Sequence, residues 1–267
     1  MNIDLLFSNF DLFNTPEKIQ KLKQAILQLA VQGKLVPQSP NDEPASELIR
    51  KIKAEKAKLI KEGKLKKEKP LTPISEDEIP YELPDGWEWV RLGEVAIIIL
   101  GQSPPSSTYN KEGKGLPFYQ GKADFGVLYP TPSTWCTSPN KIAISGDILI
   151  SVRAPVGPTN LCSETSCIGR GLSAIRMILD NSNFYFLYFL KSIEDRLSGK
   201  GFGTTFNAVT RKDLNNILTP LPPVSEQQRI VEKVDQLMKL CDELESKIGK
   251  SKEDSERLVD AILHASF

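Results

Sequence analysis

Cysteine and histidine, the residue types that build most metal and thiol sites, are scarce in this sequence. Among its 267 residues there are four cysteines, and the one histidine is His264, next to the end of the chain. No two cysteines form a C-x-x-C pair, so we do not expect a zinc site. We expect four reduced thiols instead, with at least Cys241 serving as a small core residue.

Long apolar runs and a surplus of one charge are also missing. No stretch of about 18 apolar residues occurs, which excludes a membrane-spanning helix. The first 13 residues carry acids and lack the basic start of a secretory signal, so we expect a cytoplasmic protein. Lys+Arg and Asp+Glu both total 34. Because the net charge is zero, it says nothing for or against nucleic acid, and only local charge can.

Residues 1–80 have the pattern of charged helices followed by a linker. Thr15 before Pro16 is typical of a helix start, and Gly33 is placed to end that helix. Apolar residues recur between them at steps of three and four, at Ile19, Leu22, Ile26 and Leu29. A second helix is predicted over residues 46–62. Residues 50–69 hold ten basic and three acidic residues, which fits either a solvated helix face or a surface that follows phosphates.

Residues 81–221 change character and predict a mixed α/β domain with long surface loops. Short apolar runs at 94–100 and 147–152 lie between clusters of Gly, Pro and Ser, which is typical of strands joined by loops. A helix is predicted over residues 183–197. Loops on such a scaffold are where binding residues usually lie.

Residues 222–267 predict one long helix with a heptad seam. Ser225 is placed to cap it, with Gln228 completing a capping box. Apolar and small residues then alternate at steps of four and three, at Ile230, Val234, Leu237, Cys241, Leu244, Ile248, Ser251, Ser255, Leu258, Ile262 and Ala265. This periodicity favours a partner helix over packing against the chain's own domain.

An internal similarity suggests what that partner helix is. The segment LVDAIL at 258–263 matches LKQAIL at 22–27 at four of six positions, although two amphipathic helices can agree this well by chance. We expect each helix to pair with the other, in the same chain or in a second copy. Because the first helix is too short to cover the whole seam, we expect a homodimer with two-fold symmetry.

Several segments together resemble the specificity subunit of type I restriction-modification systems. The strongest are GTTFNAVTRKDL at 203–214 and PLPPVSEQQRIV at 220–231. Four others fit in order and spacing: AILQLAVQGKLV at 25–36, LPDGWEWVRLGE at 83–94, LPFYQGK at 116–122 and GDILISVRAPVG at 146–157. Family members usually carry two recognition domains, whereas this chain shows one. It therefore looks like a half-length form, and a natural half, a truncation and a silent cassette all fit.

The resemblance implies an architecture and a set of partners. The fold would be α+β, with a target-recognition domain at 81–221 between helical spacers at 1–80 and 222–267. The chain would bind double-stranded DNA and direct methyltransferase subunits, which bring S-adenosylmethionine and methylate adenine. An ATP-dependent restriction subunit is a further partner that the resemblance allows. The alternative is a coiled-coil assembly adaptor, or a degenerate cassette, without DNA binding.

Duplex recognition needs cations for phosphates and planar hydrogen-bonding groups for base edges. Residues 81–221 hold 13 basic and 12 acidic residues, so loops must create any basic surface locally. The candidates for contact with DNA are Tyr119, Gln120, Lys122, Arg153, Arg170, Lys200, Thr204, Thr205, Asn207 and Arg211. Further candidates are Tyr109, Lys111, Lys114 and Lys212.

These candidates have different expected roles. Gln120 and Asn207 suit bidentate bonds to adenine, and the glycine-rich loop from Lys200 to Thr205 can approach phosphates closely. We expect Thr204, Thr205, Lys122 and Arg153 to share one DNA-facing surface. For each of them the competing interpretation is a solvated surface residue or a turn residue.

Two segments resemble catalytic motifs but lack an essential residue. The SPPS sequence at 103–106 has Ser106 where an adenine methyltransferase has a stacking aromatic residue. Pro84-Asp85 with Glu88 suggests a nuclease motif, but Val90 replaces its lysine. No glycine-rich loop for S-adenosylmethionine follows a strand. We therefore expect no catalytic centre, bound cofactor or metal on this chain.

Overall fold

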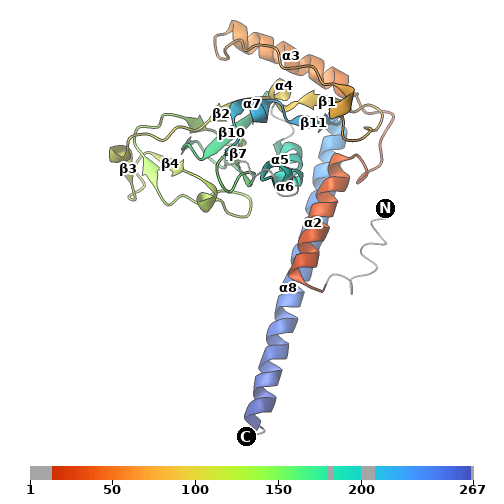
Figure 1. Ribbon diagram of the computed structural model, residues 1–267, viewed down its shortest axis with the longest axis vertical. Helices are drawn as coiled ribbons and strands as arrows, with labels where there is room; N and C mark the ends of the chain where they lie inside the picture. Colours follow the sequence, from red (N-terminus) through yellow and green to blue (C-terminus); the bar gives the residue numbers. More distant parts are fainter. Residues whose placement is uncertain (1–13, 180–182, 200–207, 266–267) are drawn as a thin grey trace.

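The computed structural model describes residues 14–179, 183–199 and 208–265. Beyond residue 251 the description of the last helix is mainly of its backbone. Helix α8 (Val224–Ala265) runs the length of the molecule, and α2 (Pro16–Val31) lies beside its first half. The strands form a lobe to one side, and α3 (Ala45–Lys61) lies across the top of that lobe in Figure 1.

Helix α2 forms where its sequence predicts it. The Thr15 hydroxyl accepts a hydrogen bond from the Lys18 backbone N–H, and Pro16 occupies the first turn. After the helix ends, Gly33 adopts a positive φ of 67°. Ile19, Leu22 and Ile26 are buried along one face. The predicted helix, its cap and its apolar face are confirmed.

Helix α3 also matches its prediction to within one residue at either end. Leu48 and Ile52 are buried on its inner face. The Ala45 N–H donates to the Gly86 carbonyl at 2.8 Å, and Lys56 Nζ donates to the Gly93 carbonyl at 2.9 Å. These bonds attach α3 to the base of the strand-rich lobe.

Three sheets make up the lobe and its base. The four-stranded sheet has the order β2-β10-β7-β8, the five-stranded sheet has the order β3-β5-β4-β9-β6, and β1 pairs with β11. All neighbouring strands are antiparallel except β4 and β9. The strands are β1 (Glu88–Arg91), β2 (Ala96–Leu100), β3 (Tyr109–Asn110), β4 (Leu116–Tyr119), β5 (Trp135–Cys136), β6 (Ile142–Ala143), β7 (Ile148–Ser151), β8 (Thr159–Leu161), β9 (Ser166–Ile168), β10 (Leu172–Met177) and β11 (Leu218–Leu221).

Short helices connect and cover these strands. Those of the α type are α4 (Leu92–Val95), α5 (Asn183–Ser192), α6 (Glu194–Leu197) and α7 (Arg211–Asn215). The 3-10 turns are η2 (Glu76–Glu78), η3 (Ser106–Thr108) and η4 (Lys122–Asp124). With helices and sheets both present, the predicted α+β class is confirmed.

Two predicted elements have different limits in the structure. The strand predicted over 94–100 begins only at Ala96, because Leu92–Val95 form helix α4. The helix predicted over 183–197 is broken at Ile193. The carbonyl before the break, that of Ser192, accepts bonds from the side-chain amides of Gln24 and Gln28 at 3.0 and 2.6 Å. These bonds draw it towards α2 and away from the helix.

The capping box predicted for α8 is wrong. The helix already begins at Val224, and the Gln227 N–H donates to the Pro223 carbonyl at 2.9 Å. The Ser225 hydroxyl donates to an Asp42 carboxylate oxygen at 2.7 Å, and Arg229 pairs with the same carboxylate. A contact with a residue distant in sequence therefore replaces the local cap.

The first half of the heptad seam packs against α2 of the same chain. Ile230, Val234, Leu237 and Cys241 are all buried. At the end of this contact, Lys23 on α2 forms ion pairs with Asp242 and Glu245 at 2.7 and 2.9 Å. The pairing of the two helices, expected in this chain or a second copy, thus occurs within the chain. Cys241 is a core residue, as predicted.

One apolar core joins the helices to the four-stranded sheet. It includes Ile26 of α2, Leu187 of α5, Ile230 of α8 and Ile150 of β7. The pairing of β1 with β11 brings the two ends of residues 88–221 together beside the start of α8. Within the described residues, no helix is both long and apolar enough to cross a membrane.

Candidate nucleic-acid interface

The ends of five strands meet along one edge of the lobe. Gln102, just after β2, donates its N–H to the carbonyl of Ile168 at the end of β9, at 3.0 Å. Gly169 donates to the carbonyl of Tyr119 at the end of β4, at 2.8 Å. Val152, after β7, donates to the carbonyl of Gly171, just before β10, at 2.9 Å. We call this the recognition edge and define it by Gln102, Ser103, Gln120, Arg153 and Arg170.

Glycine allows the loops of this edge to touch backbone to backbone. A Cβ atom on Gly101 would lie 2.1 Å from the Gly169 carbonyl oxygen. A Cβ atom on Gly171 would lie 2.2 Å from the Gln120 carbonyl oxygen. Such distances exclude a side chain at either glycine unless the backbone moves. The close crossing places the loops after β2, β4 and β9 side by side.

The turn after β4 is fixed by a carboxylate that faces inwards. One oxygen of Asp124 accepts hydrogen bonds from the backbone N–H groups of Gln120 and Gly121, at 2.6 and 3.2 Å. The side chain of Gln120 is exposed. Its amide can therefore bond a base edge, and adenine is the base that a glutamine reads bidentately.

Two arginines extend from the same edge. The backbone N–H of Arg170 donates to the Ser103 hydroxyl at 3.3 Å, which ties the loop between β9 and β10 to the loop after β2. Arg153 follows β7, and its carbonyl accepts a bond from the Ser151 hydroxyl at 3.0 Å. Both arginine side chains are exposed. A guanidinium group so placed can bond a phosphate or the edge of a guanine.

Arg153 also contacts the residues that follow four of the predicted residues in the sequence. Arg153 pairs with Ala208 in an antiparallel bridge, and the Val209 N–H donates to the Val152 carbonyl at 2.9 Å. Ala208 is the first described residue after the gap at 200–207. The candidates in that gap, Lys200, Thr204, Thr205 and Asn207, lie outside the described residues.

The charge of the recognition edge is positive. Among the described residues, neither Arg153 nor Arg170 has an ion-pair partner, and the same holds for Lys122 just after Gln120. The nearby Asp124 carboxylate is occupied by backbone N–H groups. The edge thus offers cations and hydrogen-bonding groups to a polyanion.

The structure corrects the prediction that Tyr119 contacts DNA. Its side chain is 1% exposed and packs in an apolar cluster with Leu149 and Ile168. Burial raises its pKa to about 12. Both faces of β4 are buried, with Phe118 and Tyr119 in separate apolar clusters, whereas Gln120, directly after the strand, is exposed. Tyr119 therefore cannot contact DNA in this structure and instead supports the edge from beneath.

Other predicted residues lie beside the edge or have partners of their own. Lys122 lines a groove of about 560 Å³ that also includes Gln20 and Gln24 of α2. Arg211 forms an ion pair with Glu68 at 3.2 Å. Tyr109 is partly buried and donates its hydroxyl to the Pro104 carbonyl at 2.7 Å. The predicted common surface of Lys122, Arg153, Thr204 and Thr205 stays a prediction.

Sequence reasoning missed two features of the lobe. Ser103 belongs to the segment 103–106, which was interpreted only as an incomplete catalytic motif, and Gln102 directly precedes it, yet both residues lie on the recognition edge. The second feature is an ion pair at the opposite end of the four-stranded sheet, between Asp147 just before β7 and Arg176 of β10. Asp147 is 2% exposed and receives two bonds from Arg176, at 2.9 and 2.8 Å. A charged residue next to an apolar strand run was the available signal.

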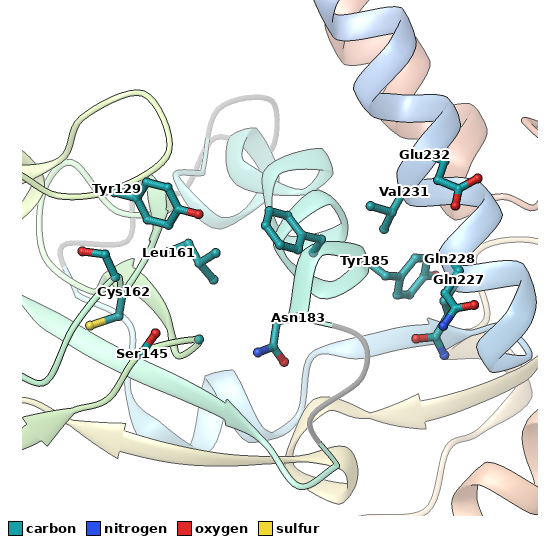
Figure 2. A pocket seen from close by; sticks show the side chains of 13 residues that line it. Tyr129, Ser145, Leu161, Cys162, Asn183, Tyr185, Gln227, Gln228, Val231 and Glu232 are labelled. Atoms are coloured by element: carbon teal, nitrogen blue, oxygen red, sulfur yellow. The ribbon is translucent and has the colours of Figure 1, made fainter.

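A groove lies between the lobe and the start of α8, as Figure 2 shows. It has a volume of about 510 Å³, with Tyr129 and Cys162 on one side and Gln227 and Val231 on the other. The Cys162 thiol donates to the Glu164 carbonyl at 3.0 Å, and burial raises its pKa. A neutral, bonded thiol is a poor nucleophile. Within the described residues, no cluster of side chains suited to a metal ion occurs.

Comparison with known sequences gives a family match over most of the chain. Residues 84–251 match the family described as the type I restriction modification DNA specificity domain. The chain is 45% identical over 186 residues to the putative type I restriction enzyme MjaX specificity subunit of Methanocaldococcus jannaschii, covering 68% of the chain and 43% of that protein. It is 37% identical over 279 residues to the EcoAI specificity subunit of Escherichia coli, covering 97% and 46%.

Solved structures give the same result. The crystal structure of the HsdS subunit from Thermoanaerobacter tengcongensis superposes with a TM-score of 0.60 at 40% identity, over 94% of this chain and 56% of that one. A chain from a study of assembly and conformational transition in a type I R-M system superposes with a TM-score of 0.65 at 42% identity, over 93% and 56%. The chain spans about half the length of the relatives that it matches.

Proposed function

Because the chain belongs to the family of type I restriction-modification DNA specificity subunits, we propose that it selects the DNA sequence on which a methyltransferase acts. The observation that carries this proposal is the recognition edge. There, Gln120, Arg153 and Arg170 are exposed just after the ends of strands β4, β7 and β9, and neither arginine has an ion-pair partner among the described residues. A cationic edge with planar donors and acceptors suits phosphates and base edges.

The chemistry in this proposal belongs to partner subunits. Methyltransferase subunits would bind S-adenosylmethionine and methylate adenine, and an ATP-dependent restriction subunit would join the same assembly. The chain described here would supply only the recognition of the DNA sequence. Its helices α2 and α8, packed along Ile230 to Cys241, would act as a rigid spacer between recognition and catalysis.

We also propose that two copies form a two-fold assembly through α8. This helix has 42 residues and is about 63 Å long, whereas α2 has 16 residues and is about 24 Å long. The relatives matched here are about twice as long as this chain, so two copies would supply the two recognition domains that the family usually carries. Sedimentation at micromolar concentration should give a dimer, and a strict monomer would contradict the proposal.

Salt-dependent DNA binding tests the proposed recognition. The purified chain should bind its target duplex with an affinity that falls steeply with salt, because each phosphate contact adds about 0.9 to the slope of log affinity against log salt. It should also prefer the target over unrelated sequences. A chain that binds no DNA at low salt would instead be an assembly adaptor.

A further inference from the structure

Residues 45–69, which contain α3 and the first part of the linker after it, are strongly basic, and their four acidic residues are all ion-paired. Four glutamates form ion pairs: Glu47 with Arg50, Glu55 with Lys58, Glu62 with Lys64 and Glu68 with Arg211. From Lys61 at the end of α3 onwards, four exposed lysines of this segment have no ion-pair partner among the described residues, and the same holds for one exposed lysine on α7. We call them the basic strip: Lys61, Lys66, Lys67, Lys69 and Lys212.

The basic strip is joined to the recognition edge by a short series of contacts. The ion pair of Glu68 with Arg211 holds the linker against α7, and Lys69 and Lys212 line one open groove of about 380 Å³ there. Helix α7 begins three residues after Ala208, which pairs with Arg153 of the recognition edge. Contacts between described residues therefore link the recognition edge, through α7, to the linker that follows α3.

Neither burial nor ion pairing explains why these five lysines lie so close together. All five are exposed, and like charges placed close together repel one another. A polyanion that spans the strip would turn this repulsion into attraction. Double-stranded DNA carries one charge per about 1.7 Å of its axis, so a duplex that lies along the strip brings several phosphates within reach of these lysines.

We propose that the basic strip contacts the phosphate backbone of DNA that flanks the target sequence, without reading its bases. This inference rests on the proposed function, because the strip can reach flanking DNA only if the recognition edge binds the target. Lysines suit this role, since an ammonium group binds phosphate as a point charge, and contacts to phosphate carry no direct sequence information. The strip would lengthen the DNA contact and raise the affinity for every sequence alike.

The test is a charge-removal variant, K61Q/K66Q/K67Q, compared with the matched variant K21Q/K239Q/K247Q. The second variant removes three exposed lysines from α2 and α8, away from the strip. Binding of the full chain is measured at several salt concentrations on a long duplex with the target, a long duplex without it, and a duplex trimmed to the target. The strip variant should lose affinity equally on both long duplexes, and its salt slope should fall by up to about 3.

Trimming the duplex separates flanking contacts from target contacts. On the trimmed duplex the strip variant should bind like the wild type, and the control variant should behave like the wild type on all three. Equal salt slopes for the strip variant and the control would overturn the proposed role of the basic strip. They would leave the proposed role of the recognition edge unaffected. A larger loss on target than on non-target DNA would also overturn it. A wild-type chain that binds no DNA would overturn both the strip and the proposed function.

Discussion

Side chains at the recognition edge fall into two kinds with different expected roles in binding. Gln120 offers a planar amide that can pair with one base, whereas Arg153 places a charge beside the bridge to Ala208. The first kind of contact distinguishes sequences, and the second raises affinity for all of them. Substitutions at the two positions should therefore change DNA binding in different ways.

We predict that Gln120→Ala relaxes the sequence preference at one base pair, by about 1–3 kcal/mol. Arg153→Ala should instead weaken all duplexes alike and reduce the salt slope by about 1. Binding to a panel of duplexes with single base changes measures both effects. Gln236→Ala, an exposed glutamine on α8, is the control. If Gln120→Ala weakens every duplex equally, Gln120 does not read a base.

The glycine contacts of the edge lead to a second prediction. Gly171→Ala places a Cβ against the Gln120 carbonyl, whereas Gly121→Ala meets no atom within 4 Å. We expect the first variant to shift the crossing loops and lower DNA affinity at least about tenfold, which corresponds to 1.4 kcal/mol. The second should bind normally. Equal affinities for the two variants would show that the crossing does not position the edge.

At the base of the lobe, Trp87 holds a buried carboxylate. Its Nε1–H donates to Glu226 at 2.9 Å, and Glu226 is 1% exposed. Burial raises the pKa of this carboxyl, while the bonds from Trp87 and Gln38 lower it. A raised pKa in the folded state means that stability falls as the pH rises through that pKa. Removing a donor that stabilises the charged form raises the pKa further.

We therefore predict that Trp87→Phe destabilises the fold most at neutral pH. The loss should exceed that of Trp89→Phe by about 1.5–3 kcal/mol, because the bond removed from Glu226 is made to a charged group. Trp89 is the matched control, since its Nε1 has no hydrogen-bond partner within the described part of the chain. Urea unfolding should show the difference shrinking as the pH falls below the folded pKa of Glu226. A difference that grows towards low pH would contradict this assignment.

At the scale of elements, the packing of α2 against α8 stabilises the helical spacer. We predict that Ile26→Ala lowers the free energy of unfolding by about 2–5 kcal/mol, because its side chain is 1% exposed in the shared core. Gln20→Ala, on the exposed side of α2, should change it by less than about 0.5 kcal/mol. Denaturant titration measures both. Similar small losses would mean that α2 does not depend on this contact.

The helices were the most predictable elements because their signals are local. Thr15 and Pro16 mark the start of α2, and apolar spacing marks its buried face. Predictions failed where a distant residue decides the outcome. Asp42 takes the hydroxyl of Ser225, and the amides of Gln24 and Gln28 draw away the carbonyl of Ser192. Such long-range bonds leave no mark in the neighbouring sequence.

The recognition edge was only partly predictable for the same reason. Exposed polar residues such as Gln120, Arg153 and Arg170 could be named from their types and from the loops that hold them. Their meeting depends on which strands pair, including the parallel pair of β4 and β9. Tyr119 was misplaced because β4 is buried on both faces, with Phe118 and Tyr119 in separate clusters, and only the packing of distant strands decides this.

At the scale of the whole molecule, one lobe and one pair of helices correspond to about half of each matched relative. The lobe presents the recognition edge, and α8 extends away from it past the end of α2. In our proposal the recognition edge selects the DNA sequence, and the helices set the distance between this edge and the partner subunits. The sequence of the methylated site in the host should then depend on this chain.

Sequencing the methylated adenines of the host genome, with and without the gene for this chain, tests that dependence most directly. We predict that deleting the gene abolishes methylation at one motif and that the wild-type gene restores it. Restoring the gene with Gln120→Ala should broaden that motif at a single position. Methylation that persists at every motif after the deletion would contradict the account.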